Sequence, residues 1–115
     1  MMSETYQAYT QNLSSTIGDI RKDIPDVMQG FSTMASAALA EGALDKKTKE
    51  LMALSIGIAT HCKGCIGFHV KALVALKVTR EELAETLGMA VYMGGGPSLM
   101  YAAEAMQAFE EFSKT

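Results

Sequence analysis

Apolar residues recur at intervals of three and four along the chain, and no stretch alternates between apolar and polar positions as a half-buried strand would. Alanine, leucine, methionine, glutamate and lysine, all good helix formers, are frequent. The pattern predicts an all-α fold, a compact bundle of five or six helices. We find no linker, low-complexity segment or internal repeat, so residues 1–115 are expected to form a single domain.

The first predicted helix covers residues 3–21 and has apolar side chains at helical spacing: Tyr6, Tyr9, Leu13, Ile17 and Ile20. Pro25 breaks this helix and can occupy the first position of the next one. The second helix is expected to stop near Gly42, and its apolar positions are Val27, Met28, Phe31, Met34, Ala35 and Ala38.

Polar capping residues indicate where the later helices begin. Asp45 is a suitable N-cap for a helix over residues 46–60, whose apolar residues cover more than one face, so burial in the domain or in an oligomer is expected. A further helix follows "HCKGC", and Thr79 with Glu82 forms a capping box for the next one. The segment "GGGP", residues 94–97, predicts a tight turn into a last helix over residues 97–112.

Composition narrows the class of protein. Apolar residues make up 49% of the chain and charged residues 20%, as in ordinary globular domains. A net charge of -3 gives no basic stripe for nucleic acid. The longest strongly apolar run, residues 51–59, is too short to span a bilayer, and the polar start "MMSETYQAYTQN" lacks a signal-peptide core. We therefore expect a cytoplasmic protein that binds neither membrane nor nucleic acid.

The segment "HCKGCIGFH", residues 61–69, holds both cysteines and both histidines of the chain. If a helix begins at or just before Cys62, the sulfurs of Cys62 and Cys65 lie on one face, close enough to form a disulfide. His69 follows Cys65 by four residues and lies on the same face. A thiol near a helix N-terminus has a stabilised thiolate, and a neighbouring imidazole can take its proton. This arrangement suits redox chemistry.

Two other readings of these residues stay open. Paired cysteines at helical spacing can simply be buried packing residues. Zinc could be held by Cys62, Cys65 and His69, with His61 as a fourth ligand, although structural zinc sites usually pair two separated clusters and this chain has one. Haem attachment is excluded, because Ile66 stands where that motif needs histidine.

Two more polar residues near this segment have a plain and a functional interpretation. Glu50 lies among lysines near a helix start, where a solvated carboxylate is common, but it precedes the apolar run and its side could turn inward. A buried carboxylate beside a histidine would orient the ring and raise its basicity. His61 can be an exposed residue in a turn.

Residues 44–99 resemble the carboxymuconolactone decarboxylase superfamily, and more narrowly its alkylhydroperoxidase AhpD-like branch. The resemblance rests on a glutamate, eleven intervening residues and C-x-x-C-x-x-x-H, which Glu50, Cys62, Cys65 and His69 match. It implies an all-helical fold that assembles into homotrimers or homohexamers. It also implies a peroxidatic cycle without bound cofactor or metal, in which Cys65 is the nucleophile, Cys62 resolves the intermediate, and Glu50 and His69 relay protons.

The resemblance further implies a hydroperoxide substrate and a dithiol reductant, either a lipoyl-bearing or a thioredoxin-like protein. The family's AhpD type carries an extra relay histidine immediately before the second cysteine, where this chain has Gly64. His61 could substitute from a different direction. This departure bears on the rate of peroxide turnover and leaves the disulfide chemistry intact. A decarboxylase-like enzyme, which would not use the cysteine pair, and a zinc-binding module remain the alternatives.

Overall fold

The computed structural model describes residues 4–114, and within them it is all-helical, as the sequence predicts. It contains six helices: α1 (Tyr6–Asp23), α2 (Pro25–Leu39), α3 (Lys46–Ala59), α4 (Lys63–Ala75), α5 (Arg80–Gly94) and α6 (Gly96–Ser113). The first helix begins later than expected, because Thr5 caps it by accepting from the Ala8 N–H at 3.1 Å. It also extends two residues further than expected, to Asp23. The predicted first residue of that helix, Ser3, lies outside the described residues, as do residues 1, 2 and 115.

The predicted caps of the later helices are confirmed. The Asp45 carboxylate accepts from the Thr48 N–H at 2.8 Å, and Thr79 and Glu82 form a reciprocal capping box. The glycine-rich break is shorter than the sequence indicates, because α5 continues to Gly94 and α6 starts at Gly96. Only Gly95 lies between them, with a φ of 76°, a backbone conformation that favours glycine.

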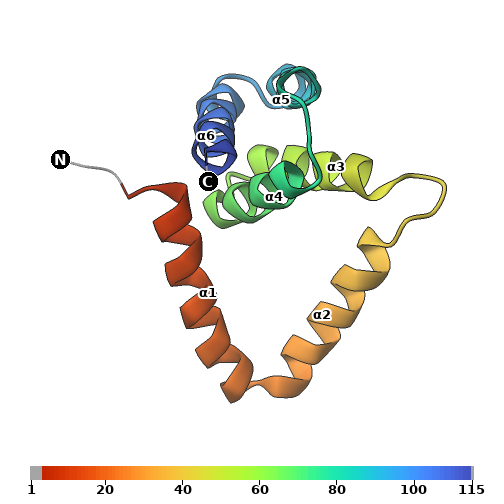
Figure 1. The fold of residues 1–115 in the computed structure, drawn as a ribbon, viewed down its shortest axis with the longest axis vertical. Helices are drawn as coiled ribbons and strands as arrows, with labels where there is room; N and C mark the ends of the chain where they lie inside the picture. Colours follow the sequence, from red (N-terminus) through yellow and green to blue (C-terminus); the bar gives the residue numbers. More distant parts are fainter. Residues whose placement is uncertain (1–3, 115) are drawn as a thin grey trace.

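Helices α3 to α6 pack together, and α1 lies against α4 and α6 (Figure 1). The core lies between α3, α4, α5 and α6, and its fully buried residues include Leu54, Ile58, Ile66, Val70, Leu73, Leu83, Ala105 and Ala108. Helices α1 and α2 form the two arms of a V that meet at the turn before Pro25 (Figure 1). No described helix is long and apolar enough to cross a membrane.

The domain leaves much of the predicted apolar surface uncovered. No residue of α2 is buried, and Val27, Phe31 and Met34 are 65%, 59% and 61% exposed. Helix α3 buries Leu54 and Ile58 completely but exposes Met52 and Ile56. The burial expected for the helix over residues 46–60 is therefore only partly provided within one copy of the chain.

Helix α1 approaches α4 closely at one point. A Cβ atom added at Gly67 of α4 would lie 2.6 Å from Cγ2 of Thr10 and 3.2 Å from Cδ1 of Tyr6. Thr10 is buried, and its hydroxyl donates to the Tyr6 carbonyl at 2.9 Å. The missing side chain at Gly67 thus lets α1 pack directly on α4, two residues beyond Cys65.

Candidate active site

The site begins at the turn from α3 into α4. Thr60 follows the last residue of α3, and His61 has a φ of 60°. The His61 N–H donates to the Ile58 carbonyl at 3.1 Å, and the Cys62 N–H donates to the Gly57 carbonyl at 2.8 Å. These two bonds and the left-handed residue between them are a Schellman motif, which ends one helix and redirects the chain. The motif places Cys62 at the N-cap of α4.

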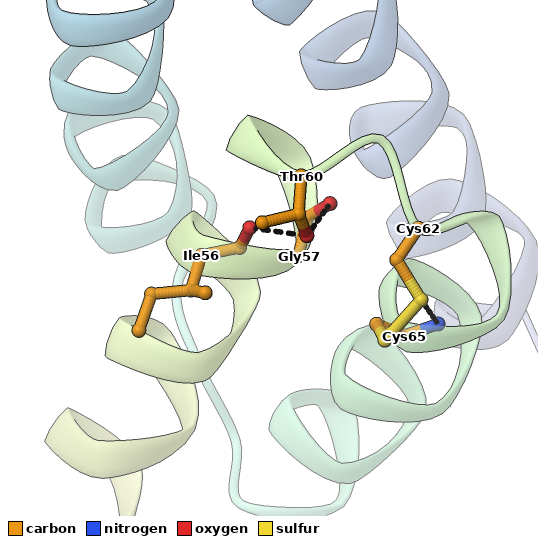
Figure 2. Close-up of a disulfide and its surroundings, with 5 residues drawn as sticks. All are labelled: Ile56, Gly57, Thr60, Cys62 and Cys65. Atoms are coloured by element: carbon orange, nitrogen blue, oxygen red, sulfur yellow. Dashed lines mark hydrogen bonds between the residues drawn. A yellow bond between two sulfur atoms is a disulfide. The ribbon is translucent and has the colours of Figure 1, made fainter.

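Cys62 and Cys65 form a disulfide, with Cα atoms 5.2 Å apart (Figure 2). Both residues are partly exposed. The Cys65 N–H donates to the Cys62 sulfur at 3.2 Å, so that sulfur takes the position of a capping oxygen. A negative charge on a sulfur in this position is stabilised by the free N–H groups at the start of α4.

Gly57 brings α3 against the disulfide. A Cβ atom added at Gly57 would lie 3.0 Å from Cβ of Cys65, closer than ordinary packing permits. Figure 2 shows Gly57 and Thr60 at the end of α3, beside the turn that leads to the disulfide. The Gly57 carbonyl accepts from the Cys62 N–H, so one residue of α3 holds the turn and also faces the second cysteine.

The side chains of Glu50 of α3 and His69 of α4 are hydrogen-bonded to each other across the same helix–helix contact. Oε1 of Glu50 lies 2.6 Å from Nδ1 of His69, and the two side chains are 5% and 29% exposed. Glu50 therefore turns inward and is not a solvated residue of the first turn. A carboxylate that accepts from Nδ1–H fixes the tautomer and leaves Nε2 as the nitrogen that can take a further proton. Such a pair can move a proton near the disulfide.

His69 follows Cys65 by one helical turn on α4. Within residues 4–114, no hydrogen bond joins either sulfur to His69. The structure thus brings the four sequence-predicted residues into two adjacent units, a disulfide and a carboxylate–imidazole pair.

Aromatic residues from distant parts of the chain contact the two neighbours of Cys62 in the chain, His61 and Lys63, and sequence reasoning did not assign them to the site. The His61 ring stacks on the Tyr101 ring of α6, with centroids 4.9 Å apart and planes 6° from parallel. Nζ of Lys63 lies 5.5 Å and 4.6 Å from the ring centroids of Tyr6 and Tyr9 on α1. No local spacing indicates these contacts, because α1 and α6 reach the site through tertiary packing.

Gly64 faces α1. A Cβ atom added at Gly64 would lie 3.2 Å from Cδ1 of Leu13. A histidine at this position would have to displace Leu13, so the packing of α1 suits the departure from the AhpD pattern noted in the sequence. The His61 ring instead lies against α6, away from Leu13.

Metal binding by the same residues finds no support in the geometry. Among the residues that the structure describes, no group of three or more histidine, cysteine, aspartate or glutamate side chains is arranged to hold a metal ion. The two sulfurs are bonded to each other, and a disulfide sulfur is not the thiolate ligand that zinc requires.

The family model and the solved structure that match this chain belong to the same family. The model of the carboxymuconolactone decarboxylase family matches residues 25–108. The crystal structure of an apo protein of that family from Legionella pneumophila superposes with a TM-score of 0.92 at 60% identity, covering 94% of this chain and 96% of that one. Two uncharacterized proteins are also similar. One, from Cupriavidus necator, is 34% identical over 85% of this chain and 87% of its own length. The other, protein 4 in the cox locus of Paracoccus denitrificans, is 30% identical over 85% and 88%.

Proposed function

Because the chain belongs to the carboxymuconolactone decarboxylase family, we propose that it is a thiol-dependent peroxidase of the alkylhydroperoxidase-like kind. In this proposal Cys62 and Cys65 cycle between dithiol and disulfide. The observation that carries it is the disulfide at the start of α4, one turn from an imidazole held by a buried carboxylate. Decarboxylation of a lactone gives the cysteine pair no role.

The oxidative half of the cycle starts with the reduced pair. His69, held by Glu50, takes the Cys65 thiol proton through water, and the thiolate attacks one oxygen of a hydroperoxide. The O–O bond breaks, the oxidised product is the sulfenic acid of Cys65, and the imidazolium returns the proton to the leaving alkoxide as an alcohol. The Cys62 sulfur then attacks the sulfenic sulfur, and water leaves with the Cys62 proton.

The two sulfurs have different surroundings, which supports different roles. Cys65 precedes His69 by one turn and faces Gly57, so it lies on the side of the carboxylate–imidazole pair. Cys62 caps α4, and the backbone N–H of Cys65 points at its sulfur. A thiolate at Cys62 is stabilised there and is suited to attack a sulfenic acid at the neighbouring position. We therefore assign the nucleophile to Cys65 and the resolving thiol to Cys62.

Intact mass measurement tests the proposal. Reduced protein treated with one equivalent of hydroperoxide is expected to lose two hydrogens, and neither Cys62→Ser nor Cys65→Ser should show this loss. Protein alkylated beforehand on both thiols is the control for oxidation elsewhere. If the wild-type thiols stay free, the proposal is wrong. Turnover of a carboxymuconolactone-type substrate by the doubly substituted protein would instead support the decarboxylase alternative.

The cycle needs a reductant, and we propose an external dithiol for that part, either a lipoyl-bearing or a thioredoxin-like protein. The disulfide is partly exposed at the start of α4, which leaves it open to attack by an incoming thiolate. Both candidate reductants can be compared directly by the rate at which each converts the oxidised protein to free thiols.

We also propose that copies of the chain associate through α2, as a trimer or hexamer. Helix α2 presents Val27, Phe31 and Met34 to solvent, together with the neighbouring exposed residues Ile20 and Ile24. Large exposed apolar side chains that gather along one helix and the turn before it mark interaction sites, whereas single scattered ones are normal on a monomer. Light scattering during size-exclusion chromatography should give a trimer or hexamer for the wild type and a smaller species for Phe31→Glu. Gln29→Glu, at an exposed polar position of the same helix, is the control. A monomeric wild type would contradict this proposal.

A further inference from the structure

His61 occupies a position where glycine is the usual residue. It is the left-handed residue of the Schellman motif that ends α3, and its φ is 60°. A side chain in this conformation is less favourable than in the right-handed region, and glycine avoids the cost. Backbone strain of this kind often marks a residue whose side chain has a function.

His61 directly precedes the first cysteine of the disulfide. Its side chain is exposed to solvent and lies flat on the Tyr101 ring. His69 lies one turn beyond Cys65 and is held by Glu50. The disulfide therefore has a histidine at each end, and the oxidative chemistry described above uses only the one at Cys65.

Charged groups near His61 are engaged with other residues. Lys63 of α4 is held over the rings of Tyr6 and Tyr9, and Glu104 of α6 accepts a hydrogen bond from the Tyr6 hydroxyl. Tyr101 presents the face of its ring, not its hydroxyl, to the imidazole. Neither of these charged groups is hydrogen-bonded or ion-paired to the imidazole in the described part of the chain.

We propose that His61 is the proton-transfer residue for reduction of the disulfide by an external dithiol. This inference rests on the proposed function, because it assigns a residue to the second half of that cycle. Thiols with ordinary pKa values near 8.5 are mostly protonated at neutral pH, and only the thiolate attacks a disulfide. A base close to the attacked sulfur therefore speeds the reaction, and His61 is the residue next to Cys62.

The steps balance as a two-electron reduction. His61 takes a proton from one thiol of the dithiol, the resulting thiolate attacks the Cys62 sulfur, and the S–S bond breaks. Cys65 leaves as a thiolate, one helical turn before His69. The second thiol loses its proton to water and then to Cys65, and attacks the reductant's sulfur in the mixed disulfide. Cys62 is released as a thiolate, takes the proton from His61, and the reductant leaves as its own disulfide.

The chain contains a matched control for the backbone. Lys77, after the other end of α4, has a φ of 63° in a second Schellman motif, with bonds from Lys77 N–H to the Val74 carbonyl and from Val78 N–H to the Leu73 carbonyl, both at 3.0 Å. Replacement of either left-handed residue by glycine relieves the same kind of strain. Only His61→Gly removes a ring beside the disulfide.

The experiment measures the two half-reactions separately. The disulfide is formed chemically with diamide, and its reduction by dithiothreitol at pH 7 is followed by quenching with an alkylating agent and mass measurement. Oxidation of the reduced protein by hydroperoxide is followed in the same way. His61→Gly should slow reduction by about 10-fold or more and leave oxidation within about 2-fold of wild type. Lys77→Gly should change neither rate, and free imidazole should restore part of the reduction rate in His61→Gly only.

Reduction of His61→Gly at the wild-type rate would overturn the inference. Equal slowing of both half-reactions without rescue by imidazole would also overturn it, because that result indicates a structural role. The starting disulfide does not depend on hydroperoxide, so a wild-type protein that fails to react with hydroperoxide refutes the proposed peroxidase while the assignment of His61 is still decided by the reduction assay.

Discussion

The contact between α1 and α4 gives a quantitative prediction about Gly67. A Cβ atom at this position would lie 2.6 Å from Cγ2 of Thr10, whereas carbon atoms in ordinary contact are about 3.5–4.0 Å apart, so one of the two must retreat by roughly 1 Å. Thr10 is 1% exposed and its hydroxyl donates to the Tyr6 carbonyl, so the side chain cannot rotate away without losing that bond. Helix α1 itself must therefore move away from α4.

Over-packing of this kind costs about 1–3 kcal/mol, and replacing glycine by alanine inside a helix recovers about 0.5–1 kcal/mol. Gly67→Ala should therefore lower the free energy of unfolding by roughly 1–2 kcal/mol and the Tm by roughly 4–10 °C. Urea unfolding and thermal melting of the oxidised protein, at one fixed protein concentration, measure both quantities. Gly88→Ala is the matched control, because a Cβ atom there would have nothing within 4 Å and should stabilise the protein slightly. If Gly67→Ala is as stable as Gly88→Ala, the reasoning about this contact is wrong.

Three further predictions concern single residues. Glu50→Gln keeps the shape of the side chain but removes the charge that holds His69. Oxidation by hydroperoxide, followed by stopped flow, should slow by about 10–100-fold, while reduction by dithiothreitol stays unchanged. Equal effects on both reactions would argue against the relay. Burial, and then the hydrogen bond to Glu104, raise the pKa of Tyr6, so the folded state favours the neutral phenol. The free energy of unfolding should therefore fall as the pH rises above about 10, where the unfolded-state phenol ionises. Urea unfolding measured against pH should show that Tyr6→Phe removes this alkaline loss. The hydrogen bonds from Thr48 lower the pKa of Asp45, so Asp45→Ala should be less stable than wild type at pH 7. The difference in the free energy of unfolding should disappear as the pH falls below about 4, the range in which the unfolded-state carboxyl is protonated.

The helices were predictable because their ends are determined locally. Asp45 and the Thr79–Glu82 pair are caps that act within four residues, and the structure contains all of these caps. The uncovered face of α2 was not predictable, because helical periodicity shows that Phe31 needs a partner but not whether that partner belongs to the same chain. The approach of α1 to α4 at Gly67 was hidden for the same reason.

The candidate site likewise has one part that local spacing predicts and other parts that only tertiary packing creates. The spacing of Cys62 and Cys65 at a helix start is sufficient to predict that their sulfurs can meet, and the structure joins them. The contact of Glu50 with His69 spans two helices, and in the sequence it was suggested only by the family resemblance and the apolar run that follows the glutamate. The stacking of His61 on Tyr101 depends on a left-handed backbone and on the packing of α6, neither of which leaves a local pattern.

The central claim is that hydroperoxide oxidises this protein through the Cys65 sulfur. The most direct test is to treat reduced Cys62→Ser with one equivalent of hydroperoxide in the presence of dimedone, which traps sulfenic acids, and to locate the adduct by mass spectrometry of peptides. We predict one adduct, on Cys65, and little or none on Cys62 in the reciprocal Cys65→Ser protein. An adduct on Cys62 alone would reverse the assignment of the two cysteines, and the absence of an adduct in both proteins would contradict the claim.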